Sequence, residues 1–126
     1  MSRYGDVAVR AVTIVAEDNV SPKSAWEKAV REFYPSSESS QWKACPRNTF
    51  LGLCEDGIID GVKNGDYCRS KNNKEYALRA VALLTKNPEL ALDEKELWSR
   101  VGGATTPNSQ MDIVISLWNA GLICDG

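Results

Sequence analysis

The sequence predicts a mainly α-helical fold, in which two related three-helix units pack into one compact body. Apolar residues recur every three or four positions in six segments, and this spacing places them on one face of a helix. Capping residues or proline precede several of these segments, and glycine or Asn-Pro follows most of them, as expected at helix ends. Three landmarks also recur in the same order in both halves of the chain.

The first half contains three predicted helices, at residues 4–17, 22–33 and about 46–56. Ser21 caps the second of them, and Pro22 suits its first position because proline already has a helical φ there. Gly57 ends the third, since glycine readily adopts the left-handed conformation that follows a helix.

The second half repeats this plan with helices at residues 73–86, 94–101 and about 108–120. The first of these ends at Asn87-Pro88, because the residue before proline is biased away from the helical conformation. Asp93 caps the second, which ends at Gly102-Gly103, and the third ends at Gly121.

An internal duplication is predicted from three matched landmarks. The segment "AVRAVTIV" at 8–15 matches "ALRAVALL" at 77–84, and a tryptophan helix follows in each half. Leu-x-x-x-Gly then recurs at 53–57 and 117–121. Chance similarity between amphipathic helices rich in alanine, valine and leucine is the alternative. We expect a single domain, residues 1–126, with pseudo-repeat halves 1–69 and 70–126.

The chain has 126 residues and a net charge of −2, and its composition excludes several kinds of chemistry. It has no histidine, the commonest general base and metal ligand, and its four cysteines form no Cys-x-x-Cys pair. Its apolar runs are shorter than the roughly 20 residues of a membrane-spanning helix. We expect a cytoplasmic protein with reduced thiols, no metal, no cofactor and no membrane insertion, and the sequence favours a non-enzymatic role.

At the end of the first unit, Gly57 is followed by two aliphatic residues, Ile58 and Ile59. This ending is similar to the helix-turn-helix core of winged-helix proteins, in which a glycine and two aliphatic residues lead into a β-hairpin wing. Asn64-Gly65, a strong two-residue hairpin signal, predicts a short β-hairpin after Gly57. The resemblance implies nucleic-acid binding through the first unit. The basic residues placed for phosphate contact are Lys43, Arg47, Lys63 and Arg69, although acidic residues are interleaved with them.

A non-catalytic interaction module is the leading hypothesis, because the sequence contains no catalytic constellation. The polar stretch "YPSSESSQWK" contains Trp42, which follows a run of serines and neighbours Lys43, so we expect this aromatic side chain to be exposed. The predicted binding residues are Trp42, Lys43, Arg47, Lys63 and Arg69. A protein partner is favoured over nucleic acid, and the identity of the partner and the oligomeric state are left open.

Cys45 is the candidate for a third hypothesis, a thiol-dependent enzyme or redox sensor. It precedes Pro46 at a predicted helix N-terminus, with Lys43 and Arg47 close by in sequence, and both features stabilise a thiolate. Without a histidine to act as base, a structural cysteine near a helix start is the favoured interpretation.

Three further segments are "CPRNTFLGLCEDGI", "NKEYALRAVALL" and "QMDIVISLWNAGLI". Through them the chain resembles, across nearly its whole length, a family of small bacterial proteins without an assigned activity. The resemblance implies no particular chemistry.

The first helices of the two halves are predicted to bury small residues around Ala11 and Ala80, where they join the halves. Replacing Ala80 with glutamate should therefore place an unpaired carboxylate in the core and lower the free energy of unfolding by roughly 3 kcal/mol or more. Thermal unfolding of the variant beside the wild type measures this loss. An unchanged unfolding temperature would show that the core assignment is wrong.

Overall fold

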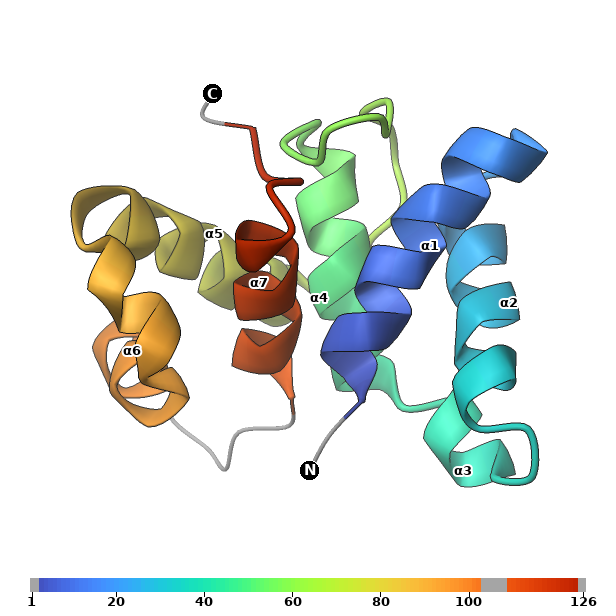
Figure 1. Ribbon diagram of the computed structural model, residues 1–126, viewed down its shortest axis with the longest axis horizontal. Helices are drawn as coiled ribbons and strands as arrows, with labels where there is room; N and C mark the ends of the chain where they lie inside the picture. Colours follow the sequence, from blue (N-terminus) through green and yellow to red (C-terminus); the bar gives the residue numbers. More distant parts are fainter. Residues whose placement is uncertain (1–2, 103–108, 125–126) are drawn as a thin grey trace.

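The computed structural model describes residues 3–102 and 109–124 and confirms the mainly α-helical fold. The α-helices are α1 (Tyr4–Asp18), α2 (Pro22–Phe33), α3 (Glu38–Gln41), α4 (Ala44–Glu55), α5 (Lys71–Lys86), α6 (Glu94–Val101) and α7 (Gln110–Asn119), and a 3-10 helix, η1 (Pro88–Leu92), follows α5. Figure 1 shows α4 and α7 in the middle of the molecule, α1 and α2 on one side of them and α5 and α6 on the other. None of the helices in these ranges is long and apolar enough to cross a membrane.

The six predicted helices are all present, and the described ends lie within two residues of the predicted ones. The predicted positions Gly103 and Asn108 lie outside the described residues. Two elements were missed. α3 lies inside the serine-rich stretch, where the Ser37 hydroxyl caps it by accepting the Ser40 N–H, and η1 begins directly at Pro88 after α5 has ended.

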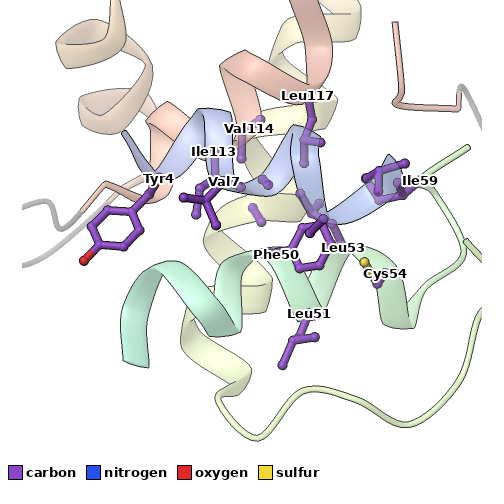
Figure 2. Close-up of a cluster of buried hydrophobic side chains, with 14 of the residues drawn as sticks. Tyr4, Val7, Phe50, Leu51, Leu53, Cys54, Ile59, Ile113, Val114 and Leu117 are labelled. Carbon is purple, nitrogen blue, oxygen red and sulfur yellow. The ribbon is translucent and has the colours of Figure 1, made fainter. Parts of the chain in front are cut away.

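The β-hairpin predicted after Gly57 is not formed, and no strand is present in the described parts of the chain. Residues 56–70 form a loop instead. Ile59 pairs with Ile123 in an isolated antiparallel bridge, flanked by backbone hydrogen bonds from Asp60 N–H to the Leu122 carbonyl and from Cys124 N–H to the Ile58 carbonyl, both 2.7 Å. An isolated hairpin is marginal in water. Ile59, which forms this bridge, is buried and lies in the apolar cluster shown in Figure 2.

The two halves join because the first helix of each half packs against the third helix of the other half. α1 packs along α2 and α7, whereas α4 packs along α5 and also contacts α7. Figure 2 shows Val7 of α1 and Ile113 of α7 in the same buried cluster as Phe50 and Leu53 of α4. Both predicted core alanines are fully buried. However, α1 and α5 make no extended contact in the described residues, so the halves do not join where the sequence predicted.

Glycine allows close approach at two helix crossings. The Gly5 N–H in α1 donates to Asp112 Oδ2 in α7 at 2.9 Å, and a Cβ at Gly5 would collide with the Ser116 hydroxyl. A Cβ at Gly52 in α4 would lie 2.9 Å from Cα of Lys74 in α5. In the predicted repeat Gly5 aligns with Lys74, and Ser116 with Gly52. The two crossings therefore use equivalent positions, which supports the duplication, although it stays a prediction.

Replacing Gly52 with alanine should destabilise the protein. Alanine is normally the better helix residue by roughly 0.5–1 kcal/mol, but here its methyl group would press on the backbone of α5. Such overpacking costs about 1–3 kcal/mol, so we expect a lower free energy of unfolding in urea. A more stable variant would mean that the crossing is looser than described.

Candidate functional site

A cleft opens where the start of α2, the first half of α4 and the loop 56–70 meet. Its volume is about 560 Å³, within the size range of small-molecule and peptide pockets. Lining residues come from all three segments. They are Ser21 and Lys23 at the start of α2, Arg47, Asn48 and Leu51 in α4, and residues 66–69 of the loop.

The cleft concentrates positive charge in a protein whose overall net charge is −2. Lys23, Arg47 and Arg69 line it together with one acidic residue, Asp66. No residue within 3–102 or 109–124 forms an ion pair with any of these three cations. Their charge is therefore available to a ligand.

The Glu55 carboxylate fixes the loop wall of the cleft. Its Oε1 accepts hydrogen bonds from the backbone N–H groups of Tyr67 and Cys68, both at 2.9 Å, and its Oε2 lies 2.7 Å from Lys74 Nζ. The same ammonium lies 2.8 Å from Asp56 Oδ1. Because Glu55 ends α4 and Lys74 belongs to α5, the pair joins two helices and the loop between them.

Both members of the Glu55–Lys74 pair stay charged across the physiological pH range. The hydrogen bond from Lys74, followed by the bond from the Cys68 N–H, lowers the pKa of Glu55 to about 2. Hydrogen bonds to Asp56 and then Glu55 raise the pKa of Lys74. With the Glu55 side chain 18% exposed and that of Lys74 24% exposed, this is a partly buried ion pair that water screens only in part.

Asn48 holds the loop a second time. Its side-chain oxygen accepts the Arg69 backbone N–H at 3.5 Å, and its backbone carbonyl accepts the Cys68 thiol at 3.4 Å. The thiol also lies 3.2 Å from the Ser70 carbonyl, and Ser70 caps α5. Burial raises the pKa of Cys68, so the group is a neutral thiol whose one hydrogen is within reach of both carbonyls. The backbone at Arg69 is thus tied to α4.

Of the five predicted binding residues, the structure brings Arg47 and Arg69 together in the cleft. Lys63 is exposed on the loop outside the cleft, and its carbonyl accepts the Tyr67 hydroxyl. Lys43 is the exposed residue before α4, and Trp42 is 48% exposed, with the Arg31 guanidinium 6.0 Å from the centre of its ring. The predicted exposure of Trp42 is confirmed.

Sequence reasoning missed Lys23, Asn48 and the Glu55–Lys74 pair. Lys23 reaches the cleft only because α2 packs beside α4, and nothing in the local sequence marks that contact. Acidic residues near the predicted basic set were interpreted only as interleaved charge, but two of them, Glu55 and Asp56, form ion pairs with Lys74.

Cys45 is half-buried in the first turn of α4 and does not line the cleft. Its carbonyl accepts the Thr49 hydroxyl at 2.8 Å. The four cysteines are free thiols, and Cys68 is the one at the cleft. Across the described ranges, no group of three or more cysteine or acidic side chains is arranged to hold a metal ion.

Comparisons with known proteins give a family but no activity. The model of a family of unknown function, DUF6979, matches residues 1–124. A LysM domain-containing protein of the fungus Arthroderma benhamiae is 28% identical over 120 residues, which cover 92% of this chain and 22% of the relative. The chain therefore spans about a fifth of that relative's length. No solved structure matches the chain.

Replacing Glu55 with glutamine should destabilise the protein in a pH-dependent way. Folding lowers the pKa of Glu55 from 4.5 to about 2, so its contribution is complete above about pH 4.5 and is lost as the pH falls through 2. At pH 7 we expect a loss of about 1.5–3 kcal/mol, as for hydrogen bonds to a charged group. Urea unfolding between pH 7 and pH 2 measures it.

The difference between wild type and Glu55→Gln should shrink as the pH falls from 4.5 towards 2. Glu89→Gln, at an exposed carboxylate in η1, is the matched control and should cost little at any pH. A difference that persists unchanged to pH 2 would show that the carboxylate charge does not hold the loop.

Proposed function

The chain belongs to the DUF6979 family, whose function is unknown, and we propose that it is a small non-catalytic interaction module that binds a protein partner through the cleft. The observation that carries this proposal is the set of three cations, Lys23, Arg47 and Arg69, gathered in one cleft without ion-pair partners among the described residues. A polar surface built this way favours an acidic segment of a partner.

The surroundings of the cleft support a protein partner. Trp42 and Lys43 lie immediately before α4, whose first turns carry Arg47, so an exposed aromatic ring and a further cation stand close to the cleft in sequence. Aromatic and arginine side chains are the residue types enriched where proteins bind each other. The free thiols agree with the cytoplasmic location that is part of this proposal.

Nucleic-acid binding remains the alternative proposal, but the geometry favours it less. It requires Lys43, Arg47, Lys63 and Arg69 on one surface, and only the two arginines line the cleft. The β-hairpin on which Lys63 and Arg69 were placed is not formed. A thiol-based activity at Cys45 gains no support, because this residue does not line the cleft.

Affinity capture from cell extract tests the proposal with three forms of the protein. The wild type should retain partners that Arg47→Ala/Arg69→Ala loses. Lys86→Ala/Lys95→Ala removes the same charge from exposed positions outside the cleft and should retain them. Equal retention by all three forms would contradict the cleft as the contact surface. If a fourth form, Trp42→Ala, were instead the one that loses the partners, the contact surface would be the stretch before α4.

Labelled duplex and single-stranded DNA should show no binding above the level of Arg47→Ala/Arg69→Ala in fluorescence anisotropy. Binding by the wild type that weakens steeply with salt and is lost in this variant would favour the nucleic-acid alternative, since counterion release produces that salt dependence.

A further inference from the structure

The charged residues that line the cleft indicate which kind of anionic ligand it binds best. Three cations and one carboxylate line it, which leaves two positive charges in excess. A carboxylate ligand carries a single negative charge, whereas a phosphomonoester carries about 1.5–2 at pH 7. A phosphomonoester therefore neutralises the cleft nearly completely, and an acidic side chain would neutralise only half of the excess.

The donor groups agree with a phosphate ligand. Arg47 and Arg69 supply planar guanidinium groups, which bind phosphate oxygens through paired N–H bonds, and Lys23 supplies an ammonium. The side-chain oxygen of Asn48 already accepts the Arg69 backbone N–H. The other polar group of this side chain is the amide nitrogen, which can only donate hydrogen bonds. The cleft thus presents donors from α2, α4 and the loop.

Contacts within the chain hold the loop wall of the cleft in place. The Glu55–Lys74 pair and Asn48 fix the backbone at residues 67–69, so Arg69 starts from a held position. A ligand then pays less conformational entropy than it would on a mobile loop. Lys74 also belongs to this network, but its charge is neutralised by its ion pairs with Glu55 and Asp56, so we do not count it among the cations that bind a ligand.

We propose that the cleft binds a phosphomonoester carried by a phosphorylated segment of the partner protein. This inference rests on the function proposed above and names the chemical group that the module recognises. A volume of about 560 Å³ exceeds what a phosphate group fills, and Leu51 and Tyr67 give the residues beside the phosphate an apolar and an aromatic wall. The net charge of −2 on the whole chain disfavours long acidic polymers and leaves a local dianion as the better match.

Calorimetric titration with three peptides of one sequence tests the recognised group. The central residue is phosphoserine in the first peptide, glutamate in the second and serine in the third. We expect the phosphoserine peptide to bind at least about tenfold more tightly than the glutamate peptide, and the serine peptide to show no measurable binding. Equal affinity for the phosphoserine and glutamate peptides would overturn the proposal.

Variants of the protein locate the site. Arg47→Gln and Arg69→Gln should each weaken binding of the phosphoserine peptide about tenfold or more, because each removes a charge-assisted pair of bonds. Lys95→Gln, an exposed position in α6, removes one positive charge outside the cleft and should leave the affinity unchanged. Equal losses in all three variants would show bulk charge attraction and would contradict a built site.

The missing histidine makes the pH dependence informative. The second pKa of a phosphomonoester is about 6, and no histidine in this chain titrates in that range. If the cleft selects the dianion, affinity for the phosphoserine peptide should rise about tenfold from pH 5 to pH 7 as the dianion forms. A flat profile would mean that the cleft does not distinguish the dianion from the monoanion, and the charge argument would fail.

Phenyl phosphate, titrated in the same way, distinguishes the carrier of the phosphate. We expect it to bind at least about tenfold more weakly than the phosphoserine peptide, since it makes fewer contacts with the walls of the cleft. Equal or tighter binding of phenyl phosphate would overturn the peptide assignment in favour of a small phosphorylated molecule. Partner capture that depends on Arg47 and Arg69 but survives phosphatase treatment of the extract would overturn the phosphate and leave the interaction module intact.

Discussion

The contact of Lys74 with the end of α4 is the interaction on which the cleft depends. Gly52 lets the backbone of α5 come close at this crossing, and the lysine stem then runs past the glycine. Its ammonium reaches Glu55 and Asp56, and Glu55 in turn holds two N–H groups of the loop. One close approach of two helices therefore sets the position of a loop wall whose sequence has no regular structure of its own.

The two halves are alike in their helices and different at this crossing. Where α5 has Lys74 against Gly52, α1 has Gly5 against Ser116, and a backbone hydrogen bond to Asp112 replaces the ion pair. The repeat alignment also places Met111, a buried residue, opposite Arg47. All the residues that line the cleft lie in the first half, so among the described residues the cleft is a feature of that half alone.

The helices could be predicted because their signals are local: apolar spacing, capping serines and terminal glycines lie within each segment. The loop could not be predicted, because Ile59 pairs with Ile123, which is far away in sequence, and a local hairpin signal carries no information about such a distant partner. The site was predicted in part. Arg47 and Arg69 were predicted from their charge, but they lie in one cleft because Asn48 and Glu55 accept hydrogen bonds from the loop and hold it against α4. Lys23 lines the cleft only because of how the helices pack.

The packing of α1 on α7 has a consequence for how the chain is made. The Gly5–Asp112 hydrogen bond joins residues 107 positions apart, and the apolar face of α1 packs on a helix that is synthesised much later than α1 itself. During translation α1 can pack against α2 as soon as α2 has been synthesised, but the part of its apolar face that packs on α7 stays uncovered for longer. Long-range contacts of this kind slow folding and expose apolar surface to other chains. The first half of the chain is therefore open to such contacts until α7 has been synthesised.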